Sequence, residues 1–449
     1  MHSRAERRKH GEDLRANVAL DSFAAVPDAS ARRDALSLLH GQDAGREQDL
    51  VPLRYQRMGA SAFAFLRGSA IVMASDLSLL PTSGITVQLC GDAHIANFGM
   101  FASAERDLVF DVNDFDETLP GPFDWDVRRL AASAAVATLS AGHSRKAARK
   151  AARESARLYR QTMAAMAQLP TLDAWYVKLD VATLTERVGG SSLGKQLIAQ
   201  GRKAGKSTAE SAAIKLTEVV DGRRRFRSDP PLVVPLWDVA DDAIAAQTLV
   251  YLGPRFKQYL VSLEPDRAAL LRHFEYVDIA RKVVGVGSVG TRAGVVLLES
   301  GDGEPLLLQM KQASASVLEP HLGASQCATH SERVVVGQRV MQASGDPFLG
   351  WVRLSDDGSN DFYVRQLRDM KASVDVAKLD KNGLIQYAGL CGAVLARAHA
   401  RVGDSSAISG YLGDTDEFDK AIADFALAYA DVNDQDYRAL VDFGKQTGS

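Results

Sequence analysis

The chain has 449 residues, which exceeds what one ordinary hydrophobic core supports and suffices for two or three packed units. Hydrophobic residues make up 46% and charged residues 24%, a balance typical of water-soluble globular proteins. The formal net charge of −3 argues against a general nucleic-acid binder or a protein of the membrane surface.

The first third of the chain predicts helices around a pair of short strands. Residues 1 to 50 are polar with a mostly helical pattern, and we interpret them as an arm or cap. Apolar residues then recur at helical spacing from Tyr55 to Leu80, until a Pro-Thr-Ser-Gly break ends the pattern. The β-branched segment from Ile85 to Cys90 predicts a buried strand, and Leu108 to Val112 predicts a second one.

Long helices and a polar segment follow. The stretch from Trp125 to Met166 is rich in alanine and arginine and predicts one or two long helices. Residues 195 to 236 are polar for most of their length and end among prolines. Three interpretations of that segment stay open: an insertion, a lid, or a linker between lobes.

From about residue 276 the pattern changes to short apolar strands joined by turns. A helix from Gly383 to Arg401 and a helical tail from Glu417 to Phe443 follow these strands, and no internal repeat is visible. The five predicted strands are Tyr276–Val284, Ala293–Glu299, Leu306–Lys311, Phe348–Leu354 and Asp361–Leu367.

These elements predict an α+β protein of two lobes. We divide it into an N-terminal helical arm (1–50), a helical lobe (51–275), a sheet lobe (276–370) and C-terminal helices (371–449) that pack on the helical lobe.

An acidic segment carries the clearest chemistry. Asp92 follows a glycine directly after the first predicted strand, Asn97 lies five residues later, and Asp114 comes after the next strand. Phosphoryl transfer needs a carboxylate to position and deprotonate a hydroxyl, and oxygen ligands to hold magnesium near the phosphates. The spacing Asp-x-x-x-x-Asn is also that of the protein-kinase catalytic loop. We therefore predict a catalytic base at Asp92 and metal ligands at Asn97 and Asp114.

Other roles for these residues remain open. Asp92 and Asn97 are residue types that cap turns. Several carboxylates crowd this region, however, and they would repel one another without a cation to neutralise them. His94 allows a metallophosphatase interpretation with Asp92, although no second His–Asp cluster completes a two-metal site. Asp126 opens a predicted helix, where it either caps that helix or braces the catalytic loop.

A glycine-rich segment lies between the first two strands of the second lobe. Gly285, Gly287 and Gly290 do not precede a helix, which excludes a dinucleotide-binding turn. A glycine-rich hairpin lets backbone N–H groups and Ser288 approach phosphate oxygens closely. The alternative is an ordinary hairpin.

Lys311 favours the phosphate-binding interpretation. It ends a predicted strand about twenty residues after the glycines, from where it would reach the same phosphates. A buried lysine needs an anionic partner. Glu332, at the start of a predicted helix, is the candidate, and its alternative role is a favourable charge in the first turn of that helix.

Seven motifs taken in order resemble one family. GDAHIANFG, FDVNDFDET, GPFDWDVRRLAAS, GVGSVGTR, LLLQMKQAS, YVRQLRDMK and LARAHA are similar to the uncharacterised bacterial domain-of-unknown-function family 2252. The resemblance covers residues from about 50 to 440. A more distant similarity is to aminoglycoside and choline phosphotransferases of the protein-kinase-like fold.

The resemblance implies a two-lobed kinase-like fold with the base, metal ligands, glycine loop and nucleotide lysine at the positions named above. Two features depart from the pattern. Cys90 stands where a histidine usually precedes the catalytic loop, and the catalytic loop precedes the glycine loop by almost two hundred residues. The second departure predicts a circular permutation, in which the helix from Gly383 to Arg401 packs beside the catalytic loop.

The resulting expectation is an ATP- and magnesium-dependent phosphotransferase that moves the γ-phosphoryl group to a hydroxyl. The acceptor is a small molecule or a protein, and nucleotide transfer in place of phosphoryl transfer stays open. A nucleotide-binding pseudokinase that serves as an interaction module is one alternative, and a metal-dependent phosphoesterase is the other.

The cysteines and the chain's N-terminal sequence predict a cytoplasmic location. Cys90, Cys327 and Cys391 stand far apart, which fits neither a disulfide framework nor a zinc site. The charged N-terminal sequence has no apolar signal region, and no apolar run is long enough to span a membrane.

Overall fold

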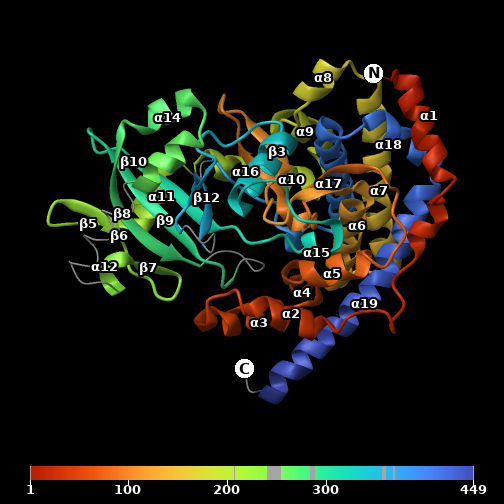
Figure 1. Cartoon of the computed structure of the whole chain (residues 1–449), viewed down its shortest axis with the longest axis horizontal. Coiled ribbons are helices and arrows are strands. Elements are labelled where there is room, and N and C mark those ends of the chain that lie inside the picture. The colour runs from red at the N-terminus through yellow and green to blue at the C-terminus, as the bar shows by residue number, and fades with distance from the viewer. Residues whose placement is uncertain are drawn as a thin grey trace.

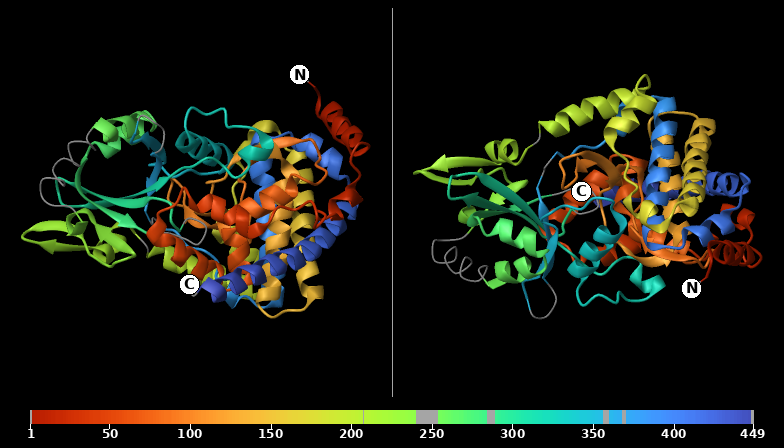
Figure 2. Two further views of the ribbon diagram at one scale, coloured as in Figure 1. Left: turned by 60° about the horizontal axis from the view of Figure 1, so that its bottom comes forward. Right: turned by 90° about the horizontal axis from the view of Figure 1, so that it is seen from above.

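The computed structural model describes residues 2–206, 208–239, 254–283, 289–355, 360–367 and 370–447. Helices gather on one side of the molecule and a twisted sheet lies on the other (Figures 1 and 2). The helical side is built from the first and last parts of the chain, and the sheet from its middle. The chain is therefore mixed helix and sheet, as expected for an α+β protein.

Short helices from the N-terminal region cover the outside of the helical lobe. Among them, α1 packs closely on α18, because a Cβ atom on Gly11 would lie 1.9 Å from the carbonyl oxygen of Ala407. These N-terminal helices are α1 (Arg4–Arg15), α2 (Ala35–Asp43), α3 (Val51–Met58), α4 (Ala62–Gly68) and α5 (Ala70–Leu77).

Four long helices form the core of the helical lobe. Ser144 caps the start of α7, and small residues on one face of that helix allow close packing. At one crossing with α17, a Cβ atom on Gly392 would lie 2.1 Å from the carbonyl oxygen of Ser155, so only glycine fits. The four helices are α6 (Phe123–Ser140), α7 (Arg145–Gln168), α17 (Lys381–Val402) and α19 (Glu417–Thr447), and α18 (Ser405–Leu412) joins the last two.

Two small antiparallel strand pairs line the side of the helical lobe nearest the sheet. The first pairs β1 (Thr86–Leu89) with β4 (Leu119–Pro122), and the second pairs β2 (Phe98–Ala102) with β3 (Leu108–Val112). The loop from β1 to β2 carries Asp92, and the loop after β3 carries Asp114.

The sheet lobe contains a six-stranded antiparallel sheet of order β11-β12-β10-β9-β8-β7. One apolar face packs against α14 (Pro265–Leu271) and residues 254–261, and the other packs against α11 (Ala209–Leu216) and, nearer the helical lobe, α16 (His330–Met341). The strands are β7 (Val233–Pro235), β8 (Phe274–Lys282), β9 (Ala293–Ser300), β10 (Pro305–Gln312), β11 (Gly350–Arg353) and β12 (Asp361–Gln366).

The polar segment 195–236 runs from one lobe to the other. Its first helix, α10 (Ser192–Gly205), contacts α17, whereas α11 contacts β10 of the large sheet. A two-stranded hairpin of β5 (Thr217–Val220) and β6 (Arg223–Phe226) extends beyond the sheet (Figure 1). The remaining short helices are α8 (Thr171–Tyr176), α9 (Val181–Val188), α12 (Leu236–Val239) and α15 (Glu319–Leu322).

The strands predicted in the second half are all present within two residues at each end, and the region 125–166 contains two helices. The sheet lobe also takes in β7 and α14, which lie before residue 276. Within the described residues, no helix is both long and apolar enough to cross a membrane.

Candidate functional site

The loop that carries Asp92 is held from behind by Asp126. Its carboxylate accepts hydrogen bonds from the backbone N–H groups of Cys90 (2.8 Å) and Gly91 (3.1 Å). Gly91 has a φ of 83°, and a Cβ atom there would lie 2.3 Å from the carbonyl oxygen of Glu117. Both the conformation and the space require glycine. Asp126 thus braces the loop, which was one of its two expected roles.

The Asp92 carboxylate is oriented by Arg129 of α6. The Nε and Nη2 atoms of Arg129 each lie 2.8 Å from Oδ1 of Asp92. Burial raises the pKa of Asp92, and the Arg129 guanidinium opposes that rise. One carboxylate oxygen is therefore occupied by arginine, while Oδ2 lies 3.7 Å from Nε2 of His94.

His94 is buried and neutral. Burial, together with the charges of Arg67 and Arg129, lowers its pKa well below the usual range. Its Nδ1 has no hydrogen-bond partner among the described residues. A neutral imidazole beside Asp92 leaves that carboxylate paired mainly with Arg129.

Asn97 is fixed by its amide nitrogen. Its side-chain Nδ2 donates to the backbone carbonyl oxygen of Asp92 at 2.8 Å, and its backbone carbonyl oxygen accepts from the backbone N–H of Asn113 at 2.8 Å. The first bond closes the loop on itself, and the second joins it to the segment that carries Asp114. The side-chain oxygen of Asn97, which is the atom a hard cation prefers, takes no part in either bond.

Lys311 of the sheet lobe contacts the acidic loop of the helical lobe, which is the loop after β3 that carries Asp114 and Asp116. Its ammonium group forms an ion pair with Asp116 and lies 4.0 Å from Asp114. The Tyr363 hydroxyl donates to Oδ1 of Asp116 at 2.8 Å. Tyr363 and Lys311 are directly paired across β12 and β10, so both reach the same carboxylate from one face of the sheet.

The charges of this cluster follow from burial and pairing. Burial disfavours the Lys311 ammonium, but Asp114 and Asp116 outweigh it and raise its pKa. Burial opposes ionisation of Asp116 as well, yet Lys311 lowers the pKa of that group. Burial and the neighbouring Asp116 raise the pKa of Asp114, and burial raises the pKa of Glu117 to about 7. The lysine is thus cationic, and Asp114 and Glu117 ionise less readily than Asp116.

Lys311 does not pair with Glu332, so the partner predicted for this lysine from the sequence is wrong. Glu332 accepts a hydrogen bond from the Ala328 N–H at 2.9 Å, and its own N–H donates to the Thr329 hydroxyl at 3.0 Å. These bonds place it in the first turn of α16, which was its alternative role. The carboxylate is engaged locally, and Asp116 supplies the partner that the lysine requires.

Only the end of the glycine-rich segment is described. Gly285, Gly287 and Ser288 lie outside the described residues. Gly290 has a φ of 88°, and its carbonyl oxygen accepts from the Glu47 N–H at 2.7 Å. The carbonyl oxygen of the neighbouring Val289 accepts a hydrogen bond from the guanidinium of Arg46, whose pKa is lowered to about 10, chiefly by burial. The end of the glycine-rich segment is therefore held by Arg46 and Glu47 of the N-terminal region.

Helix α17 supports the site from beneath, as expected for the helix predicted from Gly383 to Arg401. The Tyr387 hydroxyl donates to the carbonyl oxygen of Ile95 at 2.9 Å, inside the Asp92 loop. Arg397 forms a buried ion pair with Asp111, and Nε2 of His399 lies 3.3 Å from Asp126. Three residues of one helix thus support both acidic loops: the Asp92 loop directly and through Asp126, and the loop after β3 through Asp111 at the end of that strand.

The donor set at the site consists of oxygen atoms. Among the described residues, no group of three or more His, Cys, Asp or Glu side chains is arranged to hold a metal ion. Magnesium, however, commonly uses one or two carboxylates together with phosphate oxygens and water. Asp114 and the Asn97 side-chain oxygen fit that chemistry. A two-metal site built on Asp92, His94 and Asp114 gains no support from this geometry.

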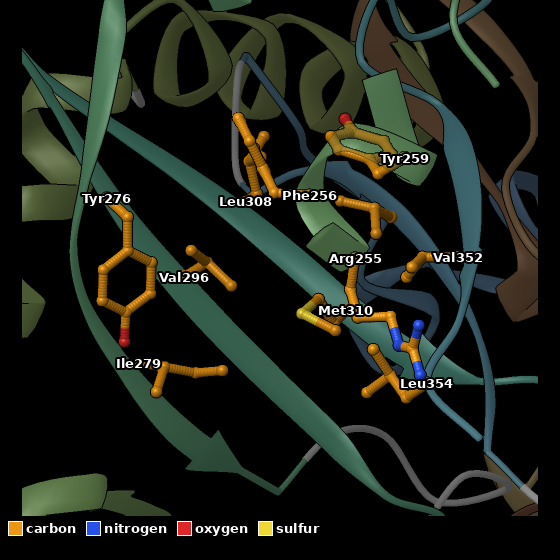
Figure 3. Close-up of a pocket in the computed structure, with 11 residues that line it drawn as sticks. Arg255, Phe256, Tyr259, Tyr276, Ile279, Val296, Leu308, Met310, Val352 and Leu354 are labelled. Atoms are coloured by element: carbon orange, nitrogen blue, oxygen red, sulfur yellow. The ribbon is translucent and has the colours of Figure 1, made fainter. Parts of the chain in front are cut away.

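The opposite face of the sheet carries an apolar cavity of about 340 Å³ (Figure 3). Leu308 and Met310 point into it from β10, whereas Lys311 follows them on the other face. Phe256 and Tyr259, from the helical residues 254–261 that pack on this face of the sheet, line the other side of the cavity (Figure 3). The cavity is therefore separate from the charged site, and the sheet lies between them.

Sequence reasoning missed several residues of the site. None of four residues that contact or flank the Asp92 and Asp114 loops is among the predicted site residues: Arg129, Asp116, Tyr363 and Arg365. Their motifs were visible in FDVNDFDET, DVRRLAAS and YVRQLRDMK, but their partners depend on packing between distant segments.

A family model of uncharacterised proteins conserved in bacteria (DUF2252) matches residues 46–443. The chain belongs to this family. No curated protein and no solved structure matches the chain. The family match covers both acidic loops, Lys311 and α17, so the whole site lies within the part of the chain that the family shares.

Proposed function

We propose that this protein is an ATP- and magnesium-dependent phosphotransferase that transfers the γ-phosphoryl group to a hydroxyl. The observation that carries the proposal is the contact between lobes, in which Lys311 of the sheet meets Asp114 and Asp116 beside the Asp92 loop. A lysine, a base and hard oxygen ligands at one junction are the groups that phosphoryl transfer uses.

The order of elements in the sheet lobe supports a protein-kinase-like fold. A glycine-rich segment joins β8 to β9, the lysine lies on the third strand of this series, and a helix, α16, follows. Protein kinases have a glycine-rich loop, a lysine on the third strand and then helix αC. The helical lobe is formed by segments before and after this unit, which fits a circular permutation.

One feature of the kinase pattern is different here. Kinases pair the lysine with a glutamate of αC, whereas Lys311 pairs with Asp116. Asp116 follows the segment expected to hold the metal. The lysine therefore neutralises these acids, and anionic phosphates would compete with Asp116 for the same ammonium group.

Asp92 acts as the base in this proposal. It accepts the proton of the acceptor hydroxyl while that oxygen bonds to the γ-phosphorus, and the bond from phosphorus to the leaving oxygen of ADP breaks. Arg129 keeps the carboxylate in position, and Asp126 fixes the loop behind it. Asn97 and Asp114 would hold magnesium, which supplies positive charge at the phosphates. Lys311 would neutralise the α- and β-phosphates.

A nucleotide-binding pseudokinase is the second candidate function. The buried His94 and the Arg129 ion pair reduce the freedom of Asp92 to act as a base. This alternative predicts nucleotide binding without turnover, which separates it from the enzyme in one experiment.

The test measures nucleotide binding and ATP consumption by the purified chain, with and without magnesium. The wild type should bind a non-hydrolysable ATP analogue only with magnesium, and it should consume ATP slowly, with water in the place of the acceptor hydroxyl and phosphate and ADP as products. Asp92→Asn should retain binding and lose turnover by roughly 10²–10⁴-fold. Asp114→Ala should lose magnesium-dependent binding. Asp107→Asn removes a surface carboxylate that pairs with Lys178, and it serves as the matched control.

Equal turnover by Asp92→Asn and wild type would refute the assignment of the base. Equal binding by Asp114→Ala and wild type would refute the metal site. Release of phosphate from a phosphoester without ATP would favour the phosphoesterase instead.

A further inference from the structure

A second cavity, of about 280 Å³, lies where the two lobes meet. The turn between β2 and β3 forms one wall, and α14, α16 and the end of β12 form the others. Asn113, next to Asp114, lines this cavity. The space therefore borders the segment that carries Asp114. Its volume is close to the lower limit of small-molecule sites, which span roughly 300–1,000 Å³.

The lining of this cavity is strongly basic. Arg106, Arg267, Arg365 and Lys371 line it, and they come from both lobes and from the segment that joins them. The acid among the lining residues is Asp346, whose carboxylate already accepts backbone N–H bonds from Phe348 (2.8 Å) and Gln366 (2.7 Å). Positive charge therefore exceeds negative charge on the lining.

Arg365 is built into the wall. Its Nε donates to Oε1 of Gln309 at 3.0 Å, and its Nη1 lies 3.5 Å from the Asn113 carbonyl oxygen. These contacts hold the guanidinium between the cavity and the acidic loop. Because a fixed guanidinium presents several N–H donors in one plane, it suits carboxylate and phosphate groups.

Lys371 faces the cavity beside Arg365. The charge of Arg365 lowers the pKa of Lys371 to about 7, Lys311 acts in the same direction, and Asp114 and Asp346 oppose the shift. Cations held this close repel one another, and an anion between them would relieve that repulsion. Asn113, Gln338 and Gln366 add amide groups to the lining, which suit a ligand with hydroxyls.

We propose that this inter-lobe cavity binds a small organic anion that carries a phosphate or carboxylate group together with hydroxyls. Under the proposed phosphotransferase function, on which this second step rests, that anion is the acceptor. The cavity is too small for a folded partner and adjoins Asp114 through Asn113, so a bound hydroxyl compound would lie next to the loop after β3 that carries Asp114.

The experiment titrates the full chain with glycerol 3-phosphate by calorimetry, in the absence of nucleotide and magnesium. Glycerol serves as the neutral probe, and citrate represents carboxylates. The wild type should bind at least one of the two anions and should not bind glycerol. Lys371→Met and Arg267→Met, which remove a charge from different walls, should each weaken binding by about tenfold or more. Thermal melts of both variants establish that they are folded.

Lys378→Met is the matched control. It removes the same charge seven residues away, where Lys378 is exposed and pairs with Asp375 at 3.1 Å. This variant should bind the anion as the wild type does. Failure of the wild type to bind either anion, or equal binding by a folded Lys371→Met, would overturn the site. Displacement of the bound anion by ATP would assign the cavity to the nucleotide and overturn the acceptor role.

The outcomes also separate this inference from the proposed function. ATP turnover without anion binding would remove the cavity and leave the phosphotransferase intact. Anion binding by a chain that neither binds nor consumes ATP would keep the cavity and remove the acceptor role.

Discussion

Replacing Lys311 with methionine keeps the aliphatic stem and removes the charge that joins the lobes. Breaking a fully buried ion pair in this way costs about 3–5 kcal/mol, because the remaining charge is left unpaired. The side chains of Asp114 and Asp116 are 36% and 27% exposed, so water solvates part of the orphaned charge. Tyr363 also keeps its hydrogen bond to Asp116. We therefore expect the free energy of unfolding to fall by about 1–3 kcal/mol.

Urea denaturation at pH 7 measures this loss, with Lys178→Met as the control. Lys178 pairs with Asp107 at 2.9 Å on the surface, where the same substitution should cost less than about 1 kcal/mol. Adding Asp116→Asn to Lys311→Met removes the unpaired carboxylate, and the double variant should recover part of the lost stability. A loss no larger than that of Lys178→Met, or no recovery in the double variant, would refute the bridging role of Lys311.

Three further predictions concern the acidic loops. Burial raises the pKa of Glu117 to about 7, so its ionised form is disfavoured in the folded state. The stability that protonated Glu117 contributes is fully present below the usual pKa of a glutamate and is lost as the pH rises through 7. Since one pKa unit corresponds to about 1.4 kcal/mol, Glu117→Gln should stabilise the protein by up to about 3 kcal/mol at pH 8 and have little effect near pH 4; melts that show the same difference at both pH values would contradict this. Gly91→Ala should destabilise by more than the roughly 1–2 kcal/mol typical of an αL alanine, whereas Gly142→Ala, with a φ of 79° and open space around it, should show the conformational cost alone. Asp126→Ala should expose the Cys90 and Gly91 amides to faster hydrogen exchange than in the wild type, and unchanged exchange in this loop would argue against the brace.

Local patterns predicted most of the elements, because apolar periodicity is a property of neighbouring residues. The segments of β3, β10 and α17 were identified almost to their ends. The hairpin of β5 and β6 is absent from the predicted elements although its signal is local. Asp221 and Gly222 lie between two strands, with φ angles of 50° and 76°, and Asp-Gly is a strong signal for such a turn.

The partners inside the site could not be predicted in the same way. Whether Lys311 meets Glu332 or Asp116 depends on how the lobes pack, and the sequence separation to Asp116 is 195 residues. A local signal did bear on Glu332, because Thr329 three residues before it predicts a capping box. The pairing of Asp92 with Arg129 likewise needs the packing of α6 against the loop.

The dependence of the acidic loops on α17 has a consequence during translation. Tyr387 and the Ile95 carbonyl oxygen that it binds are 292 residues apart, and Arg397 and Asp111 are 286 apart. A nascent chain that has emerged only through the sheet lobe holds the Asp92 loop without its support. Contacts of such long range form late and slow folding. The loops should therefore lack this part of their support on the ribosome until α17 emerges, and nascent chains halted before residue 381 should expose them to protease more than the full chain does.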